Sequence, residues 1–208
     1  MRIGFVQIDT TVGALEDNAR AVRDGARRAH ALGAELVIAP ELAIPGYPPR
    51  DILFVSSFVP ACMAAVEALA KELPPDLPVL VGTVVPATSG ARLSNVAALL
   101  RNGVVEAVYP KTLLPTYDVF DERRYFEPGT NPAAAIIEVA GTKVGVVVCE
   151  DSWNDSVFWP DRRYGTDPVE LLAQAGAEVI VNLSASPFAA GKPTLRRRLF
   201  SHAARRHG

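Results

Sequence analysis

The stretch GVVVCEDSW, residues 145–153, runs from strand-forming residues directly into a cysteine, two acids and a tryptophan. The apolar run predicts a buried strand, and the polar residues after it predict that the strand ends at Cys149. A sharp turn there would lift the thiol out of the sheet and point the backbone N–H of Glu150 toward a developing oxyanion. Free cysteines are usually buried and inert, so residue type alone favours a structural role for Cys149, although the acids that follow weaken that interpretation.

Apolar runs elsewhere in the chain alternate with helical patterns. Helices are predicted over residues 18–32, 58–73, 168–174 and 193–206. Strands are predicted over 2–8, which we expect to be buried, and over 34–40, 79–85, 95–100, 104–109, 134–139, 142–149 and 176–186. Asn102-Gly103 between two apolar runs predicts a hairpin, because both residues tolerate positive φ, and a second turn is expected at Gly141. In the second helix the predicted apolar stripe includes Met63. This order favours a mixed sheet with helices outside.

Two segments of the chain resemble each other. LGAELVIAPE (32–41) and AGAEVIVNLS (175–184) each end a helix, turn at Gly-Ala-Glu and run out along an apolar strand to a polar residue. They are either a common helix-to-strand connection or two halves of a pseudo-symmetric core that brings Glu41 and Ser184 to the same end. The segments by themselves favour the first interpretation.

The composition is that of one globular domain over residues 1–208, with 49% apolar residues, 21% charged residues and a formal net charge of −2. That charge gives no general attraction to nucleic acid or to an anionic membrane. The two cysteines do not make a disulfide framework, and the N-terminus lacks the pattern of a signal peptide. We therefore expect a soluble cytoplasmic protein. The basic segment 193–206 has an apolar face, which favours a solvated helix over a nucleic-acid site.

Three residue types at predicted strand ends suit acyl transfer. Glu41 and Lys111 each follow a proline that ends an apolar strand, and Cys149 ends another. Taken singly, Glu41 and Lys111 would be solvated charges. Together they would be a base, an oxyanion clamp and a nucleophile, and the nucleophile is expected in an exposed position. Cys62 has no acidic neighbours and is assigned to packing.

Four blocks in order resemble the nitrilase superfamily, the carbon–nitrogen hydrolases. They are PELAIPGYPPRDIL (40–53), YPKTLLPTYDVFDERRYFEPG (109–129), VVVCEDSW (146–153) and NLSASPF (182–188). Within the superfamily they are most similar to the glutaminase domains of glutamine-dependent NAD synthetases. The resemblance runs from residue 2 to about 200 and implies a four-layer-forming α-β-β-α sandwich, C-terminally truncated. By this resemblance, the domain over residues 1–208 lacks the last strands of the family and the synthetase domain that follows them.

The resemblance also implies roles for individual residues. Glu41 would take the thiol proton and later activate water, and Cys149 would form a thioester with the γ-carbonyl of glutamine and release ammonia. Lys111 and the Glu150 N–H would hold the oxyanion. Glu122 matches a second glutamate of many nitrilases, which positions the lysine or assists proton transfer.

Glutamine recognition is similarly mapped by resemblance onto Tyr117, Phe120, Glu150, Ser186 and Lys192. Lys192 stands where some relatives have arginine, so a single ammonium would replace a bidentate fork on the substrate carboxylate. The aromatic residues of the loop 111–129 favour a functional loop over a merely solvated one.

The implied partners are glutamine and a synthetase domain in cis, with a homo-oligomer expected. The resemblance implies no cofactor for this domain, since ATP and Mg²⁺ belong to the synthetase domain. No metal is implied, because none of the three histidines has ligand spacing with the cysteines. Two alternatives stay open: a stand-alone amidase or nitrilase acting on another small amide, and a truncated fragment without turnover that serves as a scaffold. Missing strands would expose a sheet edge, which predicts poor behaviour as an isolated monomer.

Overall fold

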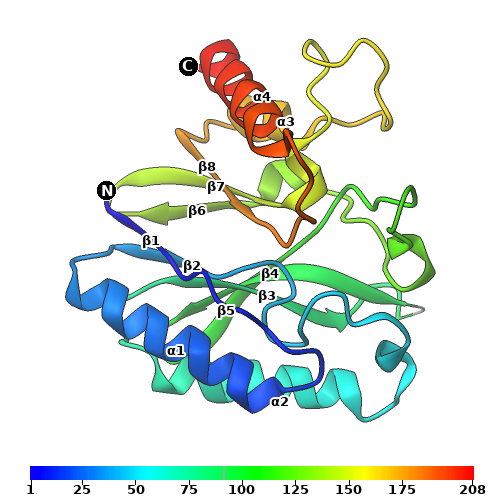
Figure 1. Cartoon of the computed structure of the whole chain (residues 1–208). Coiled ribbons are helices and arrows are strands. Elements are labelled where there is room, and N and C mark those ends of the chain that lie inside the picture. The colour runs from blue at the N-terminus through cyan, green and yellow to red at the C-terminus, as the bar shows by residue number, and fades with distance from the viewer. Residues whose placement is uncertain (91) are drawn as a thin grey trace.

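The computed structural model describes residues 1–90 and 92–208 and arranges them in four layers (Figure 1). Helices α1 and α2 cover one face of a five-stranded sheet. A three-stranded sheet lies on the opposite face, and α3 and α4 cover that second sheet. The family resemblance implied this α-β-β-α order. The alternation of elements had favoured a single mixed sheet, whereas the structure has two sheets.

The helices are α1 (Leu15–Ala31), α2 (Phe58–Glu72), α3 (Pro168–Gln174) and α4 (Lys192–His207). The first sheet contains β1 (Ile3–Phe5), β2 (Leu36–Ile38), β3 (Val79–Pro86), β4 (Leu93–Arg101) and β5 (Val104–Pro110). The second contains β6 (Ile136–Val139), β7 (Thr142–Val148) and β8 (Val179–Leu183). Short 3-10 turns are η1 (Arg50–Phe54), η2 (Glu122–Arg124), η3 (Pro132–Ala134) and η4 (Cys149–Ser152). Among the described residues, no helix is both long enough and apolar enough to cross a membrane.

Both sheets mix parallel and antiparallel pairs. In the first sheet, the strands follow the order β1-β2-β3-β4-β5, parallel from β1 to β3 and antiparallel from β3 to β5. In the second, β7 lies between an antiparallel β6 and a parallel β8. The carboxyl ends of β2 and β3 therefore point the same way, as do those of β7 and β8, and polar residues placed there can converge.

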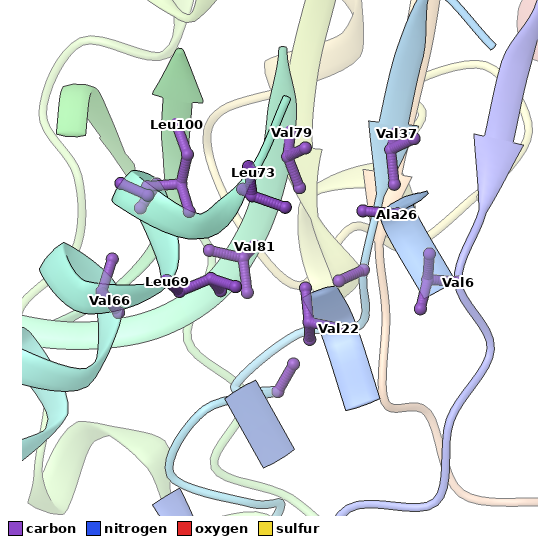
Figure 2. Packing of buried hydrophobic residues seen from close by; sticks show 14 of the residues in the cluster. Val6, Val22, Ala26, Val37, Val66, Leu69, Leu73, Val79, Val81 and Leu100 are labelled. Atoms are coloured by element: carbon purple, nitrogen blue, oxygen red, sulfur yellow. The ribbon is translucent and has the colours of Figure 1, made fainter. Parts of the chain in front are cut away.

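One core layer lies between the helices and the first sheet (Figure 2). Val22 and Ala26 of α1 and Val66 of α2 pack toward Val37 of β2 and its neighbours. The other layer fills the space between the two sheets, where Leu36, Ile38, Leu80 and Leu99 meet Val144, Val146, Val148, Val181 and Leu183. Neighbouring residues of β2 therefore enter different layers. Burial on both faces explains why this strand is apolar throughout.

Three predictions about the elements were wrong in detail. The segment 2–8 forms only a three-residue strand at the sheet edge, and the Phe5 side chain there is 72% exposed, because β1 has a partner on one side only. Helix α1 begins before Asn18, whose buried amide instead bonds Thr11 and the Ile44 carbonyl. Met63 is exposed, whereas the neighbouring Cys62 is fully buried and packs as expected.

Both predicted turns are confirmed. Asn102 and Gly103 have φ values of 55° and 78° between β4 and β5, which suits a two-residue hairpin of the type that needs positive φ twice. Ala140 and Gly141, with φ values of 49° and 75°, make the same connection between β6 and β7. Asn102, Gly103 and Gly141 adopt positive φ at little conformational cost, whereas Ala140 does so at a higher cost because of its Cβ.

Candidate active site

A lysine and two glutamates form a buried ionic cluster at the strand ends. Lys111, directly after β5, donates from Nζ to Glu41 Oε1 at 2.7 Å and to Glu122 Oε1 at 2.8 Å. Lys111 and Glu41 are each 1% exposed. Burial opposes the charged amine, but the two carboxylates outweigh it and hold the pKa of Lys111 well above its ordinary value. Burial also raises the pKa of Glu122 to about 7, against the opposing charge of Lys111. The cluster therefore keeps a protonated amine in a site closed to water.

Both oxygens of the Glu41 carboxylate have partners from other elements. Asn95 of β4 donates from Nδ2 to Oε1 at 2.9 Å, and the backbone N–H of Ala185 donates to Oε2 at 3.2 Å. The Asn95 carbonyl also accepts the Lys111 N–H at 2.8 Å, so one strand holds both residues. Sequence reasoning missed Asn95, because it lies within an apolar run and its neighbours give no sign of its partner 54 residues away.

The cysteine stands at a sharp turn, as the sequence predicted. Cys149 has φ of 45° and begins η4 directly after β7, and its N–H donates to Asn182 Oδ1 at 2.7 Å. Its Sγ accepts a hydrogen bond from Ser184 Oγ at 3.4 Å. The expectation of an exposed thiol was wrong, since Cys149 is only 7% exposed. The turn directs the side chain into the space between the sheets rather than out of the fold.

The buried thiol is protonated at neutral pH. Burial raises the pKa of Cys149 to about 12, and the charge of Glu41 adds to this, while Lys111 and the Ser184 hydroxyl act in the opposite direction. A nucleophile of this kind needs a base that removes its proton as it attacks. The carboxylate of Glu41 is the anion that acts most strongly on the thiol, and it suits that task.

Ser184 and Glu41 lie at the same end of the core. The Ser184 hydroxyl contacts Cys149, and the next residue, Ala185, contacts Glu41. The repeated helix-Gly-Ala-Glu-strand segments thus bring their polar ends to one place, as the second of the two interpretations required; pseudo-symmetry of the core stays a prediction. The two residues follow strands of different sheets: β2, which is parallel to β3, and β8, which is parallel to β7.

A buried carboxylate ties the lysine loop to the cysteine turn. Asp151 accepts the backbone N–H groups of Thr112 and Leu113 on Oδ1, at 3.0 and 2.7 Å, and that of Val148 on Oδ2 at 3.0 Å. Burial raises the pKa of Asp151 to about 7 in spite of these donors. The loop 111–129 is further closed by the Gly129 N–H, which donates to the Lys111 carbonyl at 2.8 Å.

Glu150 is the second residue of the cysteine turn. Its carboxylate accepts the hydroxyls of Tyr117, at 2.8 and 3.0 Å, and of Tyr164 at 3.1 Å. Phe120 stacks edge-on against Tyr117, with ring centroids 5.5 Å apart. The structure thus groups three of the predicted recognition residues, and it adds Tyr164, which no motif indicated.

The remaining predicted recognition residues lie after β8. Ser186 is half-buried and follows Ala185, the residue that bonds Glu41. The Lys192 amine donates to the Pro187 carbonyl at 3.2 Å and lies 5.5 Å from the Trp153 ring centroid. Its side chain therefore covers Trp153, and the Glu41–Lys111 contacts do not involve it.

An apolar cavity of about 570 Å³ adjoins the cluster. Its lining includes Leu42, Tyr47, Phe120, Glu122, Phe126 and Ala185. Glu122 Oε2 is buried in this lining and has no hydrogen-bond partner within the described ranges. Arg50 and Asp121 also line the cavity, which has room for a small polar molecule that bonds to Glu122. Among residues 1–90 and 92–208, no group of three or more His, Cys, Asp or Glu side chains is arranged to hold a metal ion.

Comparison with known proteins points in one direction. The family model described as carbon–nitrogen hydrolase matches residues 2–207. The glutamine-dependent NAD(+) synthetase of Synechocystis sp. is 42% identical over 98% of this chain and 37% of its own length. The structure of glutamine-dependent NAD+ synthetase from Acinetobacter baumannii with ADP superposes with a TM-score of 0.86 at 31% identity, over 99% of this chain and 36% of that one. An amidase of the nitrilase superfamily from Nesterenkonia has a TM-score of 0.80 at 24% identity and shares the fold. The chain thus spans about a third of the length of the synthetases it matches.

Proposed function

Since this chain belongs to the carbon–nitrogen hydrolase family, we propose that it hydrolyses the side-chain amide of glutamine through a thioester on Cys149. The observation that carries the proposal is that the Lys111 amine donates a hydrogen bond to Glu41 and that the charges of both residues act on the pKa of the Cys149 thiol. A base, a cation and a protonated thiol together are the set that amide cleavage by a cysteine requires.

The first half of the reaction would form the thioester. Glu41 takes the thiol proton while Sγ attacks the amide carbon, and the carbonyl oxygen becomes an oxyanion. The Lys111 ammonium and the Glu150 backbone N–H stabilise that oxyanion. When the intermediate collapses, the carbon–nitrogen bond breaks, and the proton held by Glu41 passes to the nitrogen, which leaves as ammonia.

The second half would return the enzyme to its starting state. Glu41, now ionised, activates a water molecule that attacks the thioester, and the carbon–sulfur bond breaks to release glutamate and the thiol. Glu122 would position Lys111 through its 2.8 Å contact and balance the charge of the amine.

Recognition of the amino-acid part would fall to the residues beside the turn. The Glu150 carboxylate is buried and accepts the Tyr117 hydroxyl, against which Phe120 packs, and a carboxylate is the group that would bind the α-ammonium group of glutamine. Ser186 and Lys192 would receive the α-carboxylate. Lys192 would exchange its Pro187 carbonyl for the substrate to do so.

We further propose that the released ammonia supplies ATP-dependent NAD synthesis by a synthetase domain in cis. The support is that relatives named glutamine-dependent NAD(+) synthetase match this chain over about a third of their length. ATP and Mg²⁺ would be needed by that domain only. A cytoplasmic setting is proposed because both cysteines are free. A homo-oligomer stays a prediction, which sedimentation would test.

The test is covalent labelling with the chloromethyl ketone analogue of L-glutamine, followed by intact mass and peptide mapping. We expect one adduct on Cys149 and none on Cys62, which is fully buried and serves as the internal control. Excess L-glutamine should suppress the adduct, and glutamine alone should release ammonia. A folded sample that gives no adduct, or an adduct that neutral amides suppress better than glutamine, would contradict the proposal.

A further inference from the structure

The Glu150 carboxylate has an unusual environment for a buried anion. It is 6% exposed, and its side-chain partners are two tyrosine hydroxyls. Across residues 1–90 and 92–208, no Lys, Arg or His side chain forms a salt bridge with it. Burial and the charge of Glu150 both raise the pKa values of Tyr117 and Tyr164, so both hydroxyls stay protonated and donate. The cation that lies near this group is Arg163, which lines the same pocket and places its guanidinium 4.0 Å from the Tyr117 ring centroid, without a salt bridge to Glu150.

The two hydroxyls converge on one oxygen. Tyr164 donates to Oε1 at 3.1 Å, and Tyr117 lies 2.8 Å from Oε1 and 3.0 Å from Oε2. A hydroxyl has a single proton, so Tyr117 donates to one oxygen at a time, whereas Tyr164 lies within hydrogen-bond distance of Oε1. Tyr164 therefore adds a second donor on the Oε1 side, and Oε2 keeps at least one lone pair for a cationic ligand.

The backbone of Tyr164 is held by a buried amide. Asn154 is 2% exposed and donates from Nδ2 to the carbonyls of Tyr164 and Thr166, at 2.9 and 2.6 Å. Its Oδ1 accepts the Tyr164 N–H at 3.3 Å. Tyr164 is consequently fixed at both of its backbone groups, and Tyr164, Arg163 and Glu150 all line a pocket of about 240 Å³.

The same segment is anchored to α4 at its two ends. Arg206 Nη1 lies 3.4 Å from Asp155 Oδ2 and 3.6 Å from Asp167 Oδ2. Arg206 Nη2 donates to Glu170 of α3 at 2.6 Å. Asp155 and Asp167 are nearly fully buried, so their ion pairs with Arg206 lie in surroundings of low dielectric and are not solvated surface pairs. One arginine thus joins α4, α3 and both ends of the Tyr164 segment.

We propose that Tyr164 is a specificity-determining positioning residue, which holds the Glu150 carboxylate so that it selects amides bearing an α-ammonium group, and that Arg206 holds the segment carrying it. The inference rests on the proposed function and extends it to residues that do not touch the reacting atoms. Selection follows because a carboxylate held in place increases the affinity for a substrate with an α-ammonium group and does not change the affinity for a neutral amide.

The experiment compares two reagents with the same warhead on the full chain. One is the chloromethyl ketone analogue of L-glutamine, and the other is chloroacetone, which lacks the amino-acid part. In both, Cys149 Sγ forms a bond to carbon, chloride leaves and Glu41 receives the thiol proton. The ratio of the two labelling rates measures selection separately from nucleophile reactivity. Tyr164→Phe should lower this ratio at least about tenfold, because a hydrogen bond to a charged group is lost, with chloroacetone labelling changed less than about twofold.

Matched variants complete the test. Tyr109→Phe removes a hydroxyl from β5, outside the Glu150 environment, and should leave the ratio unchanged. Arg206→Gln should lower the ratio in the same direction, and Arg206→Lys should restore part of it. The Tyr164→Phe/Arg206→Gln double variant should lose little more than Tyr164→Phe alone, because both changes act through one hydroxyl.

The outcomes separate the two levels of the proposal. If neither reagent labels Cys149 in the unaltered, folded protein, the proposed function fails and this inference fails with it. If the unaltered protein prefers the glutamine analogue and Tyr164→Phe keeps that preference, the inference alone is overturned. A loss of both labelling rates in Tyr164→Phe, with an unchanged melting temperature, would also overturn it, because the hydroxyl would then serve the chemistry and not the selection.

Discussion

Replacing Asp151 by asparagine should change the pH dependence of stability in a direction that the geometry sets. The carboxylate is fully buried and accepts three backbone N–H groups, two from the lysine loop and one from Val148. An asparagine can keep the two bonds on Oδ1, but its NH₂ group would face the Val148 N–H. One hydrogen bond is then lost, at a cost of about 1 kcal/mol that does not depend on pH.

The pH-dependent part comes from the charge of Asp151. Burial raises its pKa from the ordinary 3.8 to about 7 in the folded protein, although the three N–H donors act against this. As pH rises above about 4, the unfolded chain loses this proton first, so the folded state binds more protons and its stability falls until pH passes about 7. At about 1.4 kcal/mol for each pH unit, the loss approaches about 4 kcal/mol. The Asp151→Asn variant has no such group and escapes the loss.

The two contributions predict a crossover. Near pH 4 the variant should be less stable than the unaltered protein by about 1 kcal/mol, and near pH 8 it should be more stable by up to about 3 kcal/mol. Urea unfolding followed by far-UV circular dichroism at several pH values measures the difference, in which other titrating groups cancel. The reasoning is refuted if the variant becomes relatively less stable as pH rises, since the three N–H donors would then outweigh burial.

Three further predictions concern the ionic cluster and its support. Lys111→Met leaves two buried carboxylates without a cation, so it should cost about 3–5 kcal/mol in unfolding free energy and reduce Cys149 labelling at least about a hundredfold. Glu122→Gln removes a carboxyl whose pKa burial raises to about 7, so a step near that pH in the labelling-rate profile should disappear; a step that persists would assign it elsewhere. Gly82→Ala would place a Cβ against the backbone of Pro40, Glu41 and Leu42, and labelling should fall sharply. Gly165→Ala, whose Cβ meets nothing within 4 Å, is its control and should leave labelling unchanged.

Much of the cluster could be predicted because its members occupy recognisable places in the chain. Glu41 and Lys111 follow prolines at strand ends, and Cys149 follows an apolar run, so each signal is local. Asn95 and Tyr164 carry no such signal. Asn95 is one polar residue in an apolar strand. Tyr164 lies in an irregular segment, and the contacts of Arg206 with that segment and with α3 decide that Tyr164 lies beside Glu150.

The burial of Cys149 also escaped prediction, for a physical reason. The acids after it suggested a solvent-facing turn, yet Glu150 and Asp151 are themselves buried, because tyrosine hydroxyls and backbone N–H groups replace water around them. Local polarity indicates that a residue needs partners, but it does not indicate whether those partners are water or protein.

The sequence by itself determined the order of helices and strands, the two tight turns and the residue types at the strand ends, because periodicity and glycine placement act over a few residues. Only the tertiary structure decided that Glu41 and Ser184 reach the same end of the core from different sheets, that Lys111 binds two glutamates and that the thiol is enclosed with a raised pKa. Those properties depend on distances between strands remote in the chain and on the exclusion of water between two packed sheets. Neither is encoded in any short stretch of residues.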